Sequence, residues 1–474
     1  MRSRRPLLLA LLLAAATAHA QAPVSEYAAR REALAARLPD SVVLVALGAR
    51  APRADYLVFV QTPPLWYLTG WLEPDASVLM VKRGARVATT LFVPPRDPVT
   101  EEWTGPRAGV EAAAASTGLP ARPASEFRGV LDSALAGARS VYVVGDLDAS
   151  AVLSADDQFA ASLRRAHPGL MVVDAGALVD SLRSRHSAAE FALLRRAIDI
   201  TVSAERAAMR TVAPDMAEYQ VQAVIEQVFR TNGAERPGFA TIVGSGPNAT
   251  SLHHLAGDRV MHGGELVVMD IGASWRGYTA DVTRTVPVGG TFTADQAALY
   301  QIVRDAQAAA ERAAVPGADP RAVDDAANGV LAAGLARLGL IESADAVYDP
   351  PHGACHRRSE KGCLQLSLYY THALSHGIGL EVHDPDAWDF APHRLVPGAA
   401  FTIEPGLYVR AHALADLPDT PRNRAMIARV SAAFDRYANL GVRIEDDYFV
   451  TGSGVEWVSR APREISEVQQ AMAH

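Results

Sequence analysis

Two aspartates, Asp270 and Asp281, most constrain what this 474-residue chain can form. Each stands in a β-rich run, and the two runs flank a turn, residues 272–277, that begins and ends with glycine. This pattern is typical of a β-hairpin. A turn centred midway between the aspartates, between Trp275 and Arg276, would place their Cβ atoms about 5 Å apart, where like charges repel. Either one carboxyl is protonated, or a cation lies between them, or both are simply solvated.

More carboxylates fall on the polar faces of later predicted strands. Side chains alternate along a strand, so Glu404 in residues 401–406 and Glu445 in residues 441–448 lie opposite their apolar neighbours. Between these strands, three histidines occur within twelve residues: His372, His376 and His383. A single histidine here would more often be an ordinary polar residue. Three histidines beside four strand carboxylates indicate a metal site.

The first twenty residues, Met1–Ala20, are typical of a secretory signal. Three arginines precede a Leu/Ala-rich run at residues 7–18, and residues 18–20 supply the small side chains of a cleavage site. The run is shorter than the ~20 residues of a membrane span. We therefore expect an exported, periplasmic or secreted protein that begins near Gln21 without a membrane anchor. The Leu-rich run favours the general export route, although residues 3–7 faintly resemble a twin-arginine signal.

Composition excludes several classes of protein. The net charge is −8 from 45 basic and 53 acidic residues, and removal of three signal arginines makes it 42 − 53 = −11. No basic patch is interleaved with aromatic residues, so we expect no nucleic-acid partner. With 49% hydrophobic and 21% charged residues, the chain is globular rather than disordered. Two cysteines exclude a disulfide-dense scaffold and a cysteine-rich metal cluster.

Two domains follow the signal. After a predicted helix at 24–38, short β-rich runs separated by helical stretches indicate an α/β domain at 21–185, without a catalytic constellation: 42–47, 77–82, 87–93, 141–144 and 170–173. A capping box, Ser187–Glu190, then starts a long helix. In the second domain, 186–474, predicted helices alternate with strand pairs: 216–231, 294–313 and 320–338.

The motif blocks resemble the pita-bread metallopeptidases, and more closely their Xaa-Pro aminopeptidase (aminopeptidase P) and prolidase branch. The matching blocks occur in family order: 242–248 with His253, 270–285, 372–384, 404–408 and 441–446. More weakly, residues 66–70 and 102–103 resemble the aminopeptidase P amino domain. The resemblance implies an α+β protein, in which a curved antiparallel sheet flanked by helices follows the α/β domain.

The resemblance also implies roles for individual residues. Five match the family's metal ligands: Asp270, Asp281, His376, Glu404 and Glu445. Others match catalytic or substrate-side positions: His383 and His253, with Glu404, for catalysis, and His372, Tyr408 and Arg443 for substrate binding. Four ligand carboxylates carry −4, which two divalent cations neutralise, whereas one cation leaves uncompensated charge in the core. This oxygen-rich set suits manganese, with cobalt or zinc as alternatives.

The activity that the resemblance implies is release of the N-terminal residue from peptides with proline in the second position. The alternative is a prolidase, restricted to Xaa-Pro dipeptides; it shares all five ligands, so only the amino domain favours the aminopeptidase. A methionine aminopeptidase fits an exported chain less well. A catalytically silent relative would have lost ligands, and a creatinase-like enzyme lacks this ligand set. Family members are usually dimers or tetramers, so we expect a homo-oligomer.

We expect two segments to be longer than in the compact bacterial members of this family: residues 350–370 and 410–438. Either could reshape the mouth of the site and change the preferred length of the substrate. The first contains both cysteines, Cys355 and Cys363, and in an oxidising compartment we expect them to form a disulfide. A small zinc site with His352 or His356 is the weaker interpretation, because the spacing matches no usual zinc pattern.

Overall fold

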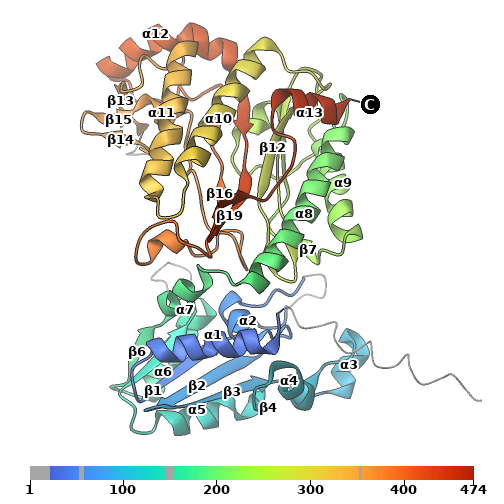
Figure 1. Ribbon diagram of the computed structural model, residues 1–474, viewed down its shortest axis with the longest axis vertical. Helices are drawn as coiled ribbons and strands as arrows, with labels where there is room; N and C mark the ends of the chain where they lie inside the picture. The colour runs from blue at the N-terminus through green and yellow to red at the C-terminus, as the bar shows by residue number, and fades with distance from the viewer. Residues whose placement is uncertain (1–21, 53–57, 146, 148–153, 352–354, 474) are drawn as a thin grey trace, which may run out of the picture. The chain divides into compact units, whose positions relative to one another are not determined.

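The computed structural model describes residues 22–473, except 53–57, 146, 148–153 and 352–354 (Figure 1). The predicted signal, Met1–Ala20, lies outside the described residues. The chain divides into two compact units between Arg183 and Ser184. In the part of the chain that the structure describes, no helix combines the length and the apolar character needed to cross a bilayer.

The first unit contains a six-stranded sheet with the order β4-β3-β2-β1-β5-β6. Its strands are β1 (Val42–Leu47), β2 (Ser77–Arg83), β3 (Arg86–Val93), β4 (Ala121–Pro123), β5 (Ser140–Val144) and β6 (Met171–Asp174). The sheet is mixed: β1–β2 and β2–β3 are antiparallel, and the other three pairs are parallel. The predicted α/β character is therefore confirmed, although the short strand β4 was not predicted.

Seven helices accompany this sheet among the described residues: α1 (Val24–Arg37), α2 (Pro63–Thr69), α3 (Pro98–Thr104), α4 (Gly109–Thr117), α5 (Phe127–Leu135), α6 (Ala155–Ala166) and α7 (Gly176–Arg183). The interior strand β1 is buried from Val42 to Ala46 without alternation. Such a continuous apolar run is what a strand covered on both faces requires.

The second unit begins with α8 (Ala188–Thr211), which starts at the predicted capping box. Ser187 Oγ accepts a hydrogen bond from the main-chain N of Glu190, and the Glu190 carboxylate accepts one from the N of Ser187. The following helices are α9 (Glu218–Thr231), α10 (Ala294–Ala313), α11 (Pro320–Leu338), α12 (Pro421–Tyr437) and α13 (Ile465–Met472). Three of these match the predicted helices, and α12 occupies most of the second long segment.

Short antiparallel sheets form the centre of this unit (Figure 1). One joins β8 (Ile242–Ser245), β9 (Leu266–Ile271) and β12 (Val282–Pro287), and another joins β7 (Arg236–Pro237), β10 (Ala273–Trp275) and β11 (Tyr278–Thr279). Two more come from later in the chain: β16 (Ala400–Ile403) with β19 (Asp446–Thr451) and β20 (Gly454–Trp457), and β17 (Gly406–Tyr408) with β18 (Gly441–Arg443). One large apolar core packs these strands against the helices.

A small sheet joins part of the first long segment, residues 350–370, to the strand just before it. It contains β13 (Val347–Tyr348), β14 (Arg358–Ser359) and β15 (Gly362–Leu364). A disulfide joins Cys355 to Cys363, with a Cα–Cα separation of 5.7 Å. The predicted disulfide is thus present, and it excludes the alternative zinc site that used these cysteines; His352 lies outside the described residues.

The register of the aspartate hairpin differs from the prediction. Asp270 on β9 pairs with Thr283 on β12, so Asp270 and Asp281 are not directly opposite each other. The turn is centred on Arg276 and Gly277, whose φ angles are 49° and 82°. Two central residues with positive φ are typical of a type I′ hairpin turn, which sets the register. Because Asp281 precedes Thr283 by two residues, the aspartates are diagonal neighbours.

Candidate metal centre

The imidazole of His376 lies among three carboxylates that come from separate strand ends. Its Nε2 atom is 3.4 Å from Oε1 of Glu404, 3.5 Å from Oδ2 of Asp281 and 3.8 Å from Oε1 of Glu445. Asp281 directly precedes β12, Glu404 directly follows β16, and Glu445 joins β18 to β19. One ligand atom each from Asp281, His376 and Glu445 lies within 4.8 Å of the others, which is a geometry that can hold a metal ion.

Asp270 joins this cluster from β9. Its Oδ2 atom accepts a hydrogen bond from Nη2 of Arg443. Its Oδ1 atom, like Oδ1 of Asp281, is buried and has no hydrogen-bond partner in the described part of the chain. Leaving a buried carboxylate oxygen unpaired costs free energy, more than for a neutral group. Bound cations would remove this cost, so the donor set fits metal binding.

Burial and mutual repulsion change the proton affinity of the cluster. Burial, with the nearby charge of Asp270, raises the pKa of Glu445 to about 8. Burial and the charge of Glu445 raise the pKa of both Asp281 and Glu404 well above their ordinary values. Burial lowers the pKa of His376 to about 4, which keeps the imidazole neutral and able to donate a lone pair to a metal. Divalent cations would compensate the carboxylates in their charged form.

A hydrogen-bonded layer fixes these ligands. Thr283 Oγ1 donates to Oε2 of Glu445 at 2.6 Å and accepts from Nε of Arg443 at 3.1 Å. Arg443, which is buried, also donates from Nη1 to the hydroxyl of Tyr408 at 2.9 Å. Second-layer contacts of this kind orient metal ligands. The predicted residues Tyr408 and Arg443 therefore lie beside the cluster.

The remaining predicted histidines lie around the same centre. His372 is 2.9 Å from the Tyr408 hydroxyl through Nε2, and its Nδ1 atom is 3.4 Å from Oε2 of Glu404. The ring centroids of His376 and His383 are 4.3 Å apart. His253 follows the 3₁₀ helix η2 (Gly246–Thr250). The pKa of His383 is lowered mainly by burial, and next by the nearby imidazole of His253. All the predicted site residues are therefore brought together.

Several residues that support the site were not predicted. Arg284, fully buried on β12, donates to Oδ1 of Asp446 at 2.7 Å and to the main-chain oxygen of Glu445 at 2.6 Å. Asp446 also accepts from Arg463 at 2.9 Å. The sequence did contain a signal for this role: Arg284 stands at an alternating, otherwise apolar position of residues 282–287. A charge buried there needs a partner.

A second buried carboxylate supports the segment that carries His253. Glu218, at the start of α9, accepts hydrogen bonds from Ser245 N at 2.8 Å, Asn248 Nδ2 at 3.0 Å and His254 Nε2 at 2.8 Å. The side chain is fully buried. Glu218 is distant in sequence from its partners, and its position in an ordinary helix start gave no sign of this role.

Comparison with known proteins agrees with this geometry. The sequence pattern of Metallopeptidase family M24 matches residues 192–452, and that of the aminopeptidase P N-terminal domain matches residues 27–142. The chain belongs to metallopeptidase family M24. Among M24 relatives, the Xaa-Pro aminopeptidase of Escherichia coli K12 is 32% identical over 462 residues, which cover 94% of this chain and 98% of that protein. The Xaa-Pro aminopeptidase of Haemophilus influenzae is 29% identical, with coverages of 96% and 98%.

Solved M24 structures have the same fold. Proline aminopeptidase P II from Yersinia pestis superimposes with a TM-score of 0.79 at 30% identity, covering 95% of this chain and 99% of that one. Aminopeptidase P from E. coli with the inhibitor Pro-Leu gives 0.77 at 29% identity, with coverages of 95% and 98%. The predicted fold, a pita-bread domain after an α/β amino domain, is therefore confirmed.

Proposed function

We propose that this M24 peptidase is a Xaa-Pro aminopeptidase, which releases the N-terminal residue from peptides with proline in the second position. The observation that carries the proposal is the cluster of His376 with Asp281, Glu404 and Glu445, found in a chain that resembles Xaa-Pro aminopeptidases along nearly its whole length. The peptide substrate is thus the partner that this site would bind.

Two divalent cations would be held by the four carboxylates and His376. When bound, such a pair activates a water molecule and polarises the scissile carbonyl. We propose manganese, because a ligand set dominated by carboxylate oxygen with one imidazole suits a hard ion; cobalt and zinc are alternatives. Asp270, Asp281, Glu404 and Glu445 together carry −4, which balances the +4 of the cations.

The side chains around the cluster would perform the proton transfers. Glu404, while also a ligand, accepts the proton of the attacking water and returns it to the leaving nitrogen. His383 and His253 are exposed, and their ring N–H groups would donate to the oxyanion that develops on the carbonyl. His372 and Tyr408, joined by their 2.9 Å contact, bind the peptide beside Glu404.

Proline imposes a particular mode of recognition. The nitrogen of an Xaa-Pro bond is a tertiary amide without hydrogen, so it cannot donate a hydrogen bond to the enzyme. The enzyme must therefore recognise the shape of the pyrrolidine ring. The free α-amine of the substrate, bound near a metal or a carboxylate, would restrict cleavage to one N-terminal residue.

A prolidase would use the same ligands on dipeptides. The match of residues 27–142 to the aminopeptidase P N-terminal domain supports the aminopeptidase. Cleavage of a Xaa-Pro dipeptide and of the corresponding Xaa-Pro-Yaa tripeptide, compared at equal concentration, tests the choice. We expect the tripeptide to be cleaved, whereas activity on the dipeptide alone would establish the prolidase.

We further propose that the protein is exported to the periplasm or secreted, with a mature chain of two domains, 21–185 and 186–474, that assembles as a homo-oligomer. The Arg-rich start followed by a short Leu/Ala run supports export. Mass spectrometry of the protein recovered from the producing cell would find Gln21 as the first residue. Light scattering would find a dimer or tetramer, and a monomer would contradict this assembly.

A further inference from the structure

The disulfide-closed hairpin of residues 355–364 presents Arg357 toward the segment that leads to the metal centre. Cys355 and Cys363 close the hairpin, and Arg357 lies just before its first strand, β14. The main chain of Arg357 is held on both sides: its N donates to Oγ of Ser367 at 2.8 Å, and its O accepts from N of Leu364 at 2.9 Å. The backbone at this position is therefore fixed.

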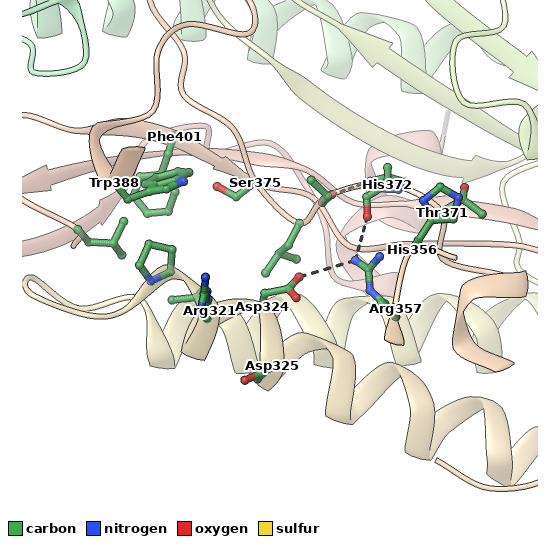
Figure 2. A pocket seen from close by; sticks show the side chains of 15 residues that line it. Arg321, Asp324, Asp325, His356, Arg357, Thr371, His372, Ser375, Trp388 and Phe401 are labelled. Atoms are coloured by element: carbon green, nitrogen blue, oxygen red, sulfur yellow. Dashed lines mark hydrogen bonds and ion pairs between the residues drawn. The ribbon is translucent and has the colours of Figure 1, made fainter. Parts of the chain in front are cut away.

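The side chain of Arg357 is fixed as well. Its Nε donates to Oδ1 of Asn328 on α11 at 2.8 Å, and its guanidinium carbon lies 3.8 Å from the ring centroid of Tyr370. Asp324, also on α11, is 3.7 Å from Nη2. The same Nη2 atom donates to the main-chain oxygen of His372 at 2.9 Å (Figure 2). The planar guanidinium of Arg357 thus contacts α11, an aromatic ring and the backbone of His372 at once, which the single ammonium of a lysine cannot do.

His372 lies between the guanidinium of Arg357 and the metal centre. Its ring packs edge-on against Tyr370, with centroids 4.9 Å apart, and contacts the hydroxyl of Tyr408 and the carboxylate of Glu404. Arg357 therefore contacts both the carbonyl of His372 and the aromatic ring against which its imidazole rests.

Arg357 approaches from outside the ligand cluster. It lines a pocket of about 730 Å³, bounded by residues 371–375 and by the start of α11, and none of the five predicted metal ligands lines this pocket (Figure 2). Arg357 therefore acts on the site through His372 rather than through direct contact with the reacting atoms.

We propose that Arg357, held by the Cys355–Cys363 disulfide, is a positioning residue that fixes His372 for the peptide substrate. The inference rests on the proposed function, since it gives His372 its substrate-side role. It also gives the segment 350–370 a role: its hairpin carries Arg357, which stabilises the position in which His372 binds the substrate. A displacement of about 1 Å in such a group can reduce catalytic efficiency by about 100-fold.

The test is Arg357→Lys, with Arg358→Lys as its control. Both substitutions keep the charge, but Arg358 is exposed on β14. We expect R357K to lower kcat/KM on a Xaa-Pro-Yaa tripeptide by about tenfold or more, without loss of bound manganese, and R358K to change it less than twofold. In a His372→Ala background, R357K should cause no further loss, because coupled residues are not additive. An equal loss in both backgrounds would overturn the inference.

A measurement independent of activity separates this inference from the proposed function. Amide hydrogen exchange of residues 366–376 reports whether Arg357 holds this segment. We expect faster exchange in R357K and in the double variant Cys355→Ser/Cys363→Ser, and wild-type exchange in R358K. Unchanged exchange in R357K would overturn the inference even if the peptidase is active. If the wild-type protein is inactive but R357K still exchanges faster than wild type, the proposed function is refuted. The positioning of His372 by Arg357 is then still supported.

Discussion

The Nε2 atom of His376 lies 3.5 Å from Oδ2 of Asp281, although the two residues come from distant parts of the second unit. Ligand atoms bound about 2.0–2.2 Å from one metal ion lie roughly 3.0–3.5 Å from each other. The two side chains are thus already separated by nearly the distance that a shared ion requires. This arrangement makes the cluster a candidate metal centre.

Asp281→Asn should abolish turnover, because it replaces a charged ligand by a neutral amide. The loss of activity should exceed the roughly 10–100-fold loss that follows removal of a residue that only hydrogen-bonds a metal ligand. The metal-free variant should be at least as stable as the wild type, because burial and the charge of Glu445 disfavour ionised Asp281. Peptide hydrolysis, metal analysis after dialysis, and thermal unfolding check this. Exposed Asp435→Asn is the control, and activity retained by D281N would contradict the assigned ligand.

Manganese should stabilise the folded protein, since the cations compensate carboxylates that repel one another. At a free metal concentration 100 times the dissociation constant, binding adds about 2.7 kcal/mol to the free energy of unfolding. Scanning calorimetry of the dialysed protein with and without Mn²⁺ would show a higher melting temperature. The increase should disappear in D281N; an equal increase in both proteins would indicate binding elsewhere.

Glu218→Gln should destabilise the protein in a pH-dependent way. Burial alone would raise the pKa of Glu218, but hydrogen bonds led by those from Ser245 outweigh it and hold the pKa below the ordinary 4.5. The ionised carboxylate therefore contributes stability that is fully present above pH 4.5 and is lost as the pH falls through the lower folded-state pKa.

The expected cost of E218Q is about 1–3 kcal/mol at pH 7, the range for leaving buried hydrogen-bonding groups unsatisfied. Thermal unfolding at a series of pH values should show the variant and the wild type converging below pH 4.5. A difference that stays constant across this range would show that the charge of Glu218 is not what stabilises the segment. Glu226→Gln, at another position of α9, is a matched comparison.

Asp446→Asn should be among the most destabilising substitutions in the second unit. Asp446 accepts from Arg284 at 2.7 Å, from Ser459 at 2.7 Å and from Arg463 at 2.9 Å, and the Arg284 side chain is completely buried. Removing one member of a buried ion pair costs about 3–5 kcal/mol, because the other charge stays buried and uncompensated. Chemical denaturation would measure this cost, and a loss below 1 kcal/mol would contradict the importance of the network.

The family resemblance implied a set of ligand residues that the structure brings close together, but the register of the aspartate hairpin was not predicted. Strand alternation predicted Glu404 and Glu445 on the polar faces of two strands, and the structure places each of them directly next to a strand end, in the same cluster as Asp281. The hairpin register depended on which two residues form the turn. Arg276 adopts a positive φ, which is unusual for a non-glycine residue and has no strong sequence signal.

Contacts between distant segments were beyond the reach of sequence patterns. The disulfide was predicted because an exported chain reaches an oxidising compartment. The contact of Arg357 with the main-chain oxygen of His372, in contrast, depends on how the whole hairpin packs against α11. Likewise, Arg284 and Asp446 meet only because β12 and β19 lie in the same core. Physical chemistry says that each buried charge needs a partner, but it does not say which one.

The most direct test of the proposed function is the identification of products from one Xaa-Pro-Yaa tripeptide incubated with the manganese-loaded protein. Mass spectrometry should find the free N-terminal amino acid and the dipeptide Pro-Yaa, with no product from the matched Xaa-Ala-Yaa tripeptide. Dialysed protein without metal should give neither product. Release of Yaa from the C-terminus, or an intact Xaa-Pro-Yaa peptide in the presence of bound manganese, would contradict a metal-dependent Xaa-Pro aminopeptidase.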